Sequence, residues 1–268
     1  MDVSNSIELA RKVRLHALKM VNRGGSSHIA SVLSTVDILA VLYARVMNYK
    51  SKKPKWINRD RFILSKGHAG VGVYAVLAES GFFNVADLDN HYQDGSIFSG
   101  HVSHKGIPGV ELSTGSLGHG LSIGSGMALA AKIDKKKHRV VVLMSDGELD
   151  EGSNWEAFMF SSHHCLNNLT AIIDRNGLQS IKTTEETLAL EPLAKKLNAF
   201  GWHVIEVDGH NHEALFNSIM LAVDKPKVII ANTIKGKGVS FMEDENKWHY
   251  QTPKDDLFEK AIKELEDI

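Results

Sequence analysis

The sequence predicts an α/β protein with a doubly wound, mostly parallel sheet and helices on both faces. The strongest observation is a pair of short apolar runs, Val140–Met144 and Ala171–Ile173, which are aliphatic or β-branched on both alternating faces. This pattern is typical of strands buried on both sides, as in a parallel sheet covered by helices. In addition, strand patterns alternate with helical patterns along the rest of the chain, which favours parallel strands joined by crossover helices.

The segment between the two runs has the pattern of a helix. Trp155, Phe158 and Met159 recur at helical spacing, and Ser153 just before them is a candidate N-cap. The polar segment Cys165–Asn168 then ends the helix. Strand, helix and strand together form a βαβ unit of roughly 30 residues. The ends of its two strands are therefore expected side by side at the carboxyl edge of the sheet.

Each of these strands stops at a polar corner, Asp146-Gly147 after the first and Asn176-Gly177 after the second. Open α/β sheets bind ligands at this edge, so the corners are candidates for a binding site. The Asp146 carboxylate, the Asn176 amide oxygen and a backbone carbonyl near Leu178 are suitable oxygen ligands for Mg²⁺, with room for diphosphate oxygens and a water. Gly147 lets the chain pass close to a phosphate. An isolated Asp-Gly pair is usually only a turn, but two such corners one crossover apart favour a metal site.

Several further elements are predicted before this unit. Asn5 and Glu8 form a candidate capping box for a first helix that ends at Gly24-Gly25, and a loop follows over 26–32. In order, the sequence then predicts a helix over 35–46, a strand over 59–65, a helix over 71–78, a short helix over 85–91 and a helix over 121–133. The long loop over 93–117 is expected to be functional, because such loops are uncommon inside compact domains.

After the unit, the elements again alternate. They are a helix that begins at 190–192, a strand over 202–207, a helix over 212–223, a strand over 227–231, a loop over 232–242 and a charged amphipathic helix over 254–268. No linker, low-complexity segment or repeat divides the chain. We therefore expect a single domain over residues 1–268.

The composition bounds the function. A chain of 268 residues with 43% hydrophobic and 24% charged residues is ordinary for a globular α/β domain. Its net charge of −1 argues against nucleic-acid binding, and the basic run Lys135–Arg139 is interpreted as a solvated loop. The single Cys165 excludes an intrachain disulfide and a cysteine-rich metal site. Without a signal-peptide core or an apolar run near the ~20 residues that span a bilayer, we expect a cytoplasmic protein with no membrane partner.

The chain contains fourteen histidines, and most are expected to be surface residues or partly buried hydrogen-bonding groups. His28, His68 and His101 differ, because each lies at a glycine- or serine-rich corner that the predicted topology places at the carboxyl edge. His249 lies in a similar polar loop. No histidine spacing is typical of a zinc site. With a pKa of about 6.5, such histidines could both accept and return a proton near neutral pH.

Motifs with a familiar pattern extend over nearly the full chain. The pair of corners resembles the thiamine diphosphate signature, Gly-Asp-Gly followed one crossover later by Asn, with Ser145 in place of the first glycine. Five stretches then match transketolases in order: Asn58–His68, Gly109–Gly118, Asp146–Glu148 with Glu151-Gly152, Asp174–Leu178 and Thr233–Phe241. The chain thus resembles the N-terminal subunit of a split transketolase. The resemblance implies the thiamine diphosphate-binding fold of the diphosphate-binding type.

The resemblance also implies roles for individual residues. Four would be catalytic and surround the thiazolium ring and the sugar hydroxyls: His28, His68, His101 and His249. Three would hold Mg²⁺, or Ca²⁺ or Mn²⁺ in its place: Asp146, Asn176 and the carbonyl of Leu178. The implied cofactor-binding residues are Gly115, Ser116 and Leu117 at the aminopyrimidine, Gly147 at the diphosphate, and Glu148, Glu151, Asn176 and Lys235, with Glu151 at a subunit interface.

The implied activity is transfer of a two-carbon ketol unit from a ketose or ketose phosphate donor to an aldose acceptor, with thiamine diphosphate as the electron sink. The implied partner is a complementary C-terminal subunit that supplies the catalytic glutamate, in an α2β2 heterotetramer. The chain departs from the usual family pattern at Ser145, Ile29, His119 and Tyr250. Most of these departures surround the expected substrate site. A pentose-phosphate transketolase is therefore the leading expectation, and a relative acting on an unusual sugar is the second.

Two other functions stay open at the level of the sequence. One is the diphosphate-binding subunit of another thiamine diphosphate enzyme, such as a 2-oxo acid dehydrogenase, which would not need the histidine cluster. The other is a catalytically degenerate binding subunit, against which the intact Asp146, Asn176 and corner histidines argue. An assay of ketol transfer against 2-oxo acid decarboxylation separates the first alternative.

Overall fold

The computed structural model describes residues 3–267, and the strands within this range form one five-stranded sheet in the order β1-β2-β3-β5-β4. Every neighbouring pair is parallel, so the predicted parallel α/β sheet is confirmed. The strands are β1 (Arg61–Leu64), β2 (Val140–Ser145), β3 (Leu169–Arg175), β4 (His203–Asp208) and β5 (Lys227–Asn232).

The register of the sheet brings the strand ends level. Ser145 at the end of β2 pairs with Asp174 in β3, and Arg175 at the end of β3 pairs with Asn232 at the end of β5. The polar segments that follow these strands therefore all start at the same carboxyl edge, as the βαβ argument predicts.

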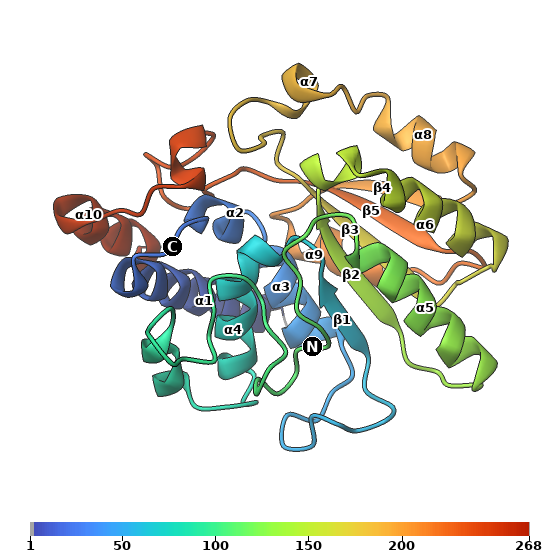
Figure 1. Cartoon of the computed structure of the whole chain (residues 1–268), viewed down its shortest axis with the longest axis horizontal. Helices are drawn as coiled ribbons and strands as arrows, with labels where there is room; N and C mark the ends of the chain where they lie inside the picture. The colour runs from blue at the N-terminus through green and yellow to red at the C-terminus, as the bar shows by residue number, and fades with distance from the viewer. Residues whose placement is uncertain (1–2, 268) are drawn as a thin grey trace.

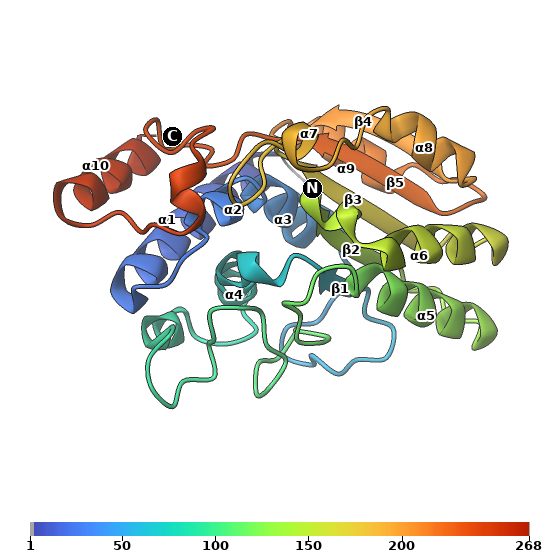
Figure 2. The same ribbon diagram turned by 45° about the horizontal axis from the view of Figure 1, so that its top comes forward.

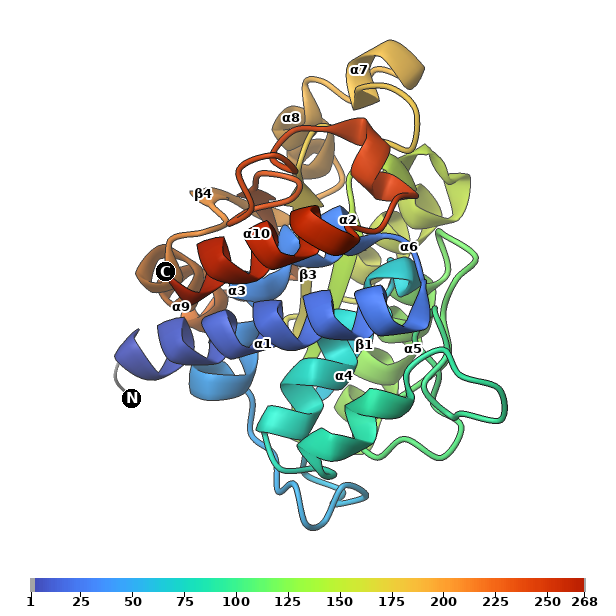
Figure 3. The same cartoon turned by 90° about the vertical axis from the view of Figure 1, so that its left-hand side faces the viewer.

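Helices cover both faces of the sheet (Figures 1 and 2). One face carries α1 (Val3–Gly24), α3 (Val36–Val41), α4 (Gly70–Glu79) and α9 (His212–Met220), and the other carries α5 (Gly120–Ile133), α6 (Gly152–His163) and α8 (Leu193–Ala199). Figure 3 shows α10 (Asp255–Glu266) beside α1. The short helices are α2 (Ile29–Leu33) and α7 (Thr184–Thr187).

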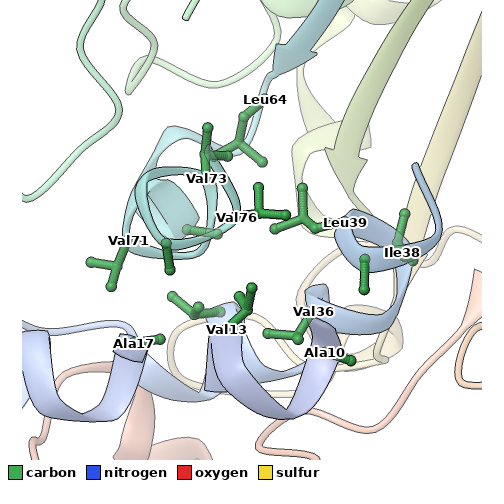
Figure 4. Close-up of a cluster of buried hydrophobic side chains, with 14 of the residues drawn as sticks. Ala10, Val13, Ala17, Val36, Ile38, Leu39, Leu64, Val71, Val73 and Val76 are labelled. Carbon is green, nitrogen blue, oxygen red and sulfur yellow. The ribbon is translucent and has the colours of Figure 1, made fainter. Parts of the chain in front are cut away.

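Alternate residues of each strand enter the two layers. In β2, Val141 and Leu143 pack into the layer of α1 and α4, whereas Val142 and Met144 pack into the layer of α5 and α6. Burial on both faces explains why the strand is a continuous apolar run. Figure 4 shows the first layer, in which Leu64 at the end of β1 lies near aliphatic side chains of α1, α3 and α4. Each such side chain contributes about 1.5–3 kcal/mol on burial, and this packing fixes the end of β1 from which Lys66 and His68 extend.

Three local predictions are wrong. Helix α1 is already formed at Val3, so Asn5 lies inside the helix, and Glu8 bonds to Arg11 at 3.0 Å instead of closing a capping box. The N-cap of α6 is Glu151, and Ser153 lies inside that helix. The predicted loop over 26–32 contains α2, whereas the predicted helix over 35–46 is confirmed and ends in a π-helical turn over Leu42–Val46.

Within the described residues, no helix is both long enough and apolar enough to cross a membrane.

Candidate active site

A cavity of about 240 Å³ opens at the carboxyl edge, where the segments after β1, β2, β3 and β5 meet. It is lined by Ser31, Lys66, His68, Leu117, Ser145, Asp146, Gly147, Asn176, Leu178, Gln179, Ser180, Lys235, His249 and Tyr250. A larger hollow of about 490 Å³ lies between residues 83–98 and 106–108, away from this edge, and neither histidine nor lysine lines it. The chemistry of the first cavity, and not its size, makes it the candidate site.

Asp146 holds its carboxylate in a fixed position at one end of the cavity. Its side chain is buried, Oδ1 accepts the N–H of Gly147 at 2.8 Å, and Oδ2 accepts the N–H of Gly177 at 2.7 Å. Arg175 lies 3.3 Å from Oδ2. Burial raises the pKa of this carboxyl, the charge of Asp174 raises it further, and the two N–H groups and Arg175 oppose the shift. A cation next to Asp146 would favour its charged form.

The amide of Asn176 is oriented by a buried carboxylate. Its Nδ2 donates to Oδ2 of Asp174 at 3.0 Å, so its Oδ1 faces the other way and accepts the N–H of Leu178 at 3.1 Å. Asp174 also accepts hydrogen bonds from Ser34, at 2.8 Å, and from Thr233. The amide therefore presents an oxygen, with a second lone pair free, beside the Asp146 corner.

These donors suit a hard cation. One carboxylate, one amide oxygen and one backbone carbonyl are typical Mg²⁺ or Ca²⁺ ligands. No group of three or more histidine, cysteine, aspartate or glutamate side chains within residues 3–267 is arranged to hold a metal. The residues present therefore fit a magnesium-like ion that also uses ligand oxygens, and they do not fit zinc.

Two buried ammonium groups lie on the same wall. Lys66 pairs with Asp174 at 2.5 Å. Lys235 donates to the carbonyls of Leu178 at 3.1 Å and Gln179 at 2.9 Å, and it has no ion pair within the described residues. Burial, with the nearby charge of Lys66, lowers the pKa of Lys235 to about 8. A buried cation without an acidic partner is stabilised by an anionic ligand, and a diphosphate has that charge.

The four predicted histidines form one cluster, of which His68 and His249 line the cavity and His28 and His101 do not. The ring centroid of His28 lies 5.2 Å from that of His68, 5.6 Å from that of His101 and 4.8 Å from that of His249. The backbone N–H of His28 donates to the carbonyl of His249 at 2.9 Å, which joins the two loops. His28 adopts a left-handed backbone conformation, with φ of 72°, which a non-glycine residue rarely adopts. The topology thus brings together residues separated by more than two hundred positions in the sequence.

Burial makes these histidines weaker bases than the sequence predicts. It lowers the pKa of His28 to about 4 and that of His249 to about 3, and it lowers the pKa values of His68 and His101 as well. The expectation of a pKa of about 6.5 is therefore wrong for these groups. At neutral pH the rings are uncharged, so each carries one donor and one acceptor nitrogen.

The loop over 115–118, called the glycine loop, lies beside the histidines and is fixed by a buried side chain. Leu117 lines the cavity, and a Cβ placed on Gly115 would lie 3.3 Å from the ring of His101. Glu148 is fully buried beneath this loop, where it accepts the N–H of Gly118 at 2.8 Å and the hydroxyl of Ser65. Its pKa is raised, chiefly by burial.

Several predicted cofactor residues do not line the cavity. They are Gly115, Ser116, Glu148 and Glu151. Glu148 instead fixes the loop that carries Leu117, and Glu151 caps α6 with its Cβ close to Gly118. Conversely, the sequence prediction missed Lys66 and Asp174. A lysine two positions after the apolar run of β1, and an aspartate directly after the apolar run of β3, were the available signals.

The chain is similar to known transketolases over nearly its whole length. Residues 5–265 match the family described as transketolase, thiamine diphosphate binding domain. An apulose-4-phosphate transketolase subunit of Phocaeicola vulgatus is 43% identical over 259 residues, covering 96% of this chain and 92% of that protein. The 6-deoxy-6-sulfo-D-fructose transketolase subunit SqwG of Clostridium sp. is 39% identical over 260 residues, with 96% and 94% covered.

Longer transketolases match along part of their length. The human enzyme is 40% identical over 259 residues, which are 96% of this chain and 41% of that protein. The crystal structure of transketolase from Campylobacter jejuni superposes with a TM-score of 0.93 at 30% identity, covering 99% of this chain and 43% of that one. The chain thus spans about two fifths of these longer relatives and nearly the whole of the two subunits.

Proposed function

The chain belongs to the transketolase family, in which it corresponds to the thiamine diphosphate-binding domain, and we propose that it is the cofactor-binding subunit of a split, metal-dependent transketolase. One observation carries the proposal. His68 and His249 line the same cavity as the oxygen donors Asp146 and Asn176, and the ring of His28 lies close to both of them and to His101. Proton-handling groups beside a diphosphate site are what ketol transfer requires.

One end of the cavity, the metal end, would bind the metal ion and the diphosphate. Asp146, the Oδ1 of Asn176 and the carbonyl of Leu178 would hold Mg²⁺, or Ca²⁺ or Mn²⁺ in its place. Gly147 would face the diphosphate, and Lys235 would complement its charge. When bound, thiamine diphosphate supplies the electron sink for the cleaved carbon–carbon bond.

The histidines handle the substrate hydroxyls. The Nδ1 of His28 is tied to the hydroxyl of Ser27 at 2.6 Å, so its Nε2 is the nitrogen available for another group. His68 and His101 are uncharged and can accept the proton of the donor's hydroxyl as the carbon–carbon bond breaks. The same groups can return a proton to the new alcohol after the aldose is attacked.

A partner chain completes the proposed site. Among the described residues that line the cavity, Asp146 is the only carboxylate, and it lies at the metal end. A second acid near the histidines, the catalytic glutamate of the proposal, would come from a complementary C-terminal subunit in an α2β2 assembly. Two relatives are themselves named as transketolase subunits. Their names support a chain that works with another.

The proposed contact surface lies over α5 and α6. The exposed apolar side chains on it include Ile123, Met159 and Phe160. Between the two helices is a hollow of about 310 Å³, lined by Ser122, Ser125, Gly126, Glu156, Ala157 and Phe160. An apolar surface of this kind supports burial against another chain. Glu151, at the start of α6, lies at the edge of this surface.

The proposed substrates are a ketose donor and an aldose acceptor, with phosphorylated pentose-pathway sugars as the leading candidates. The named relatives act on apulose 4-phosphate and on 6-deoxy-6-sulfo-D-fructose. An unusual sugar is therefore the second candidate. Tyr250 supports it, because this exposed aromatic side chain lines the cavity against the ring of His249 at 4.7 Å.

Two measurements test the proposal. Calorimetric titration of the chain, with its complementary subunit present, with thiamine diphosphate and Mg²⁺ is expected to give saturable binding that disappears when Mg²⁺ is chelated. Combined with its complementary subunit, the chain is expected to transfer a ketol unit from a ketose phosphate to an aldose phosphate and not to decarboxylate a 2-oxo acid. Decarboxylation without ketol transfer would favour the 2-oxo acid dehydrogenase alternative. Cofactor binding without either reaction would favour a degenerate binding subunit.

A further inference from the structure

A polar cluster outside the cavity is centred on the buried carboxylate of Asp37. Arg14 donates to both of its oxygens, at 3.0 Å to Oδ1 and 2.5 Å to Oδ2. Nε2 of His212 lies 3.0 Å from Oδ1, and Nδ1 of His210 lies 2.7 Å from Oδ2. Arg14 alone compensates the charge of Asp37, so charge balance does not require His210. The proposed mechanism uses none of these residues.

The other ring nitrogen of His210 holds a backbone group. Its Nε2 lies 2.9 Å from the backbone nitrogen of Ile234, which can only donate. Nε2 must therefore be the unprotonated acceptor, and the ring proton is on Nδ1, where it is donated to Asp37. Asp37 thus selects the tautomer in which His210 can hold Ile234. The ring is tied at both nitrogens and cannot turn without breaking one of the two bonds.

The segment that His210 holds carries Lys235. This lysine directly follows Ile234, is 1% exposed, and lines the cavity beside Leu178 and Gln179. The backbone N–H groups of Thr233 and Gly236 donate to backbone carbonyls. His210 is therefore the only side chain, among the described residues, that accepts a backbone N–H from residues 233–236.

The turn that carries His210 packs directly on this segment. The N–H of Gly209 donates to the carbonyl of Asn232 at 2.7 Å, and a Cβ added to Gly209 would lie 2.4 Å from Cγ2 of Thr233. The turn is itself fixed, because the N–H of His210 donates to the carboxylate of Asp208 at 2.8 Å. A change at His210 is thus transmitted to the Lys235 segment through close contacts.

We propose that His210 is a positioning residue for the cofactor site: with its proton fixed by Asp37, it holds Ile234 so that Lys235 faces the diphosphate end of the cavity. The inference rests on the proposed function, because it assigns Lys235 to the binding of thiamine diphosphate. It differs from a purely structural role in which His210 only packs against the Arg14–Asp37 pair.

A matched pair of variants separates the two roles. The amide of glutamine reaches the position of Nε2 and can accept from Ile234, whereas the amide of asparagine reaches only the position of Nδ1 and keeps the contact with Asp37. Calorimetric titration with thiamine diphosphate and Mg²⁺ measures the affinity of each variant for the cofactor. The affinity of His210→Gln is expected to lie within about threefold of the wild-type value, and that of His210→Asn to be lower by about tenfold or more. Equal affinities, equal losses or the reverse order would overturn the proposal.

Hydrogen exchange tests the contact without any ligand. In the unliganded wild-type chain, the amide of Ile234 is expected to exchange at least about tenfold more slowly than that of Lys235, which finds no acceptor within the described residues. Exchange at Ile234 as fast as at Lys235 would overturn the proposal even if a variant fails to fold. A wild-type chain that binds no cofactor even with its complementary subunit present would refute the proposed function and this inference together. Wild-type binding with the wrong order of variants would refute only the role of His210.

Discussion

The two ends of the cavity are built differently. At the metal end, Asp146 and Asn176 use their polar atoms in hydrogen bonds of 2.7–3.1 Å that fix each side chain. At the other end, the histidine rings lie mainly against one another, and Nδ1 of His249 is buried without a hydrogen-bond partner among residues 3–267. One end is preorganised to bind charge, and the other is a cluster of uncharged bases with free nitrogens.

The difference follows from where the residues come from. Asp146 and Asn176 extend from neighbouring strands whose register fixes their distance. The four histidines come from separate loops and turns, and contacts such as the bond from His28 to the carbonyl of His249 hold them together. We therefore expect substitutions at the metal end to abolish binding, and substitutions at the histidine end to slow turnover.

Replacement of Asp146 should give the largest effect. Asp146→Ala removes the one carboxylate that the described residues place on the cavity wall, so affinity for thiamine diphosphate with Mg²⁺, with the complementary subunit present, is expected to fall at least about 100-fold, with the fold retained. Calorimetric titration measures the loss, and circular dichroism checks the fold. Asp134→Ala, an exposed position after α5, is the control and should bind normally. Unchanged affinity in Asp146→Ala would refute the metal assignment.

Replacement of His68 or His101, in the histidine cluster, should lower turnover. His68→Ala and His101→Ala are each expected to lower turnover of the complete enzyme by about 100-fold or more, because a proton-transfer group is lost. Affinity for the cofactor should change much less, since the metal end is intact. His163→Ala, on the exposed side of α6, serves as the control. Near-wild-type turnover in both variants would return these histidines to a structural role.

Replacement of Glu148, which fixes the glycine loop, should have a smaller effect, on the stability of the fold. Glu148→Gln places an amide N–H opposite the backbone N–H of Ser145, at a site where the carboxylate now accepts at 3.3 Å. The loss of this acceptor in a buried position is expected to destabilise the chain by about 1–3 kcal/mol. Urea unfolding measures the change, with Glu259→Gln on the exposed side of α10 as the matched control. Equal stability of the two variants would contradict the anchoring role.

The smallest effect concerns pH. Burial holds the folded-state pKa of His28 at about 4 and that of His249 at about 3, below the ordinary value near 6.5. As the pH falls below about 6.5, the unfolded chain therefore binds protons first, and folding stability decreases from pH 7 to pH 5. Thermal midpoints should show this decrease, and the double variant His28→Gln with His249→Gln should show a shallower one.

The sequence could predict that the Asp146 and Asn176 corners lie side by side, because the signals for this are local. Each buried strand is followed at once by its polar residues, and the parallel register of β2 and β3 places the two polar segments side by side. It could not predict the supporting groups: Lys66 and Asp174 are 108 positions apart, and only the fold shows that they form a buried pair. Glu148 was predicted in the cofactor site, but the turn over Gly147–Asp150 directs its side chain beneath the glycine loop. The lowered histidine pKa values depend on burial, which residue spacing does not reveal.

The central claim is that this chain provides one half of an active site that another subunit completes. The direct measurement is ketol transfer between a ketose phosphate and an aldose phosphate by the purified chain, saturated with Mg²⁺ and thiamine diphosphate. It is made with and without the chain from the same genome that matches the rest of the longer transketolases. We predict no transfer by the chain alone and robust transfer by the pair. Robust turnover by the single chain would contradict the account.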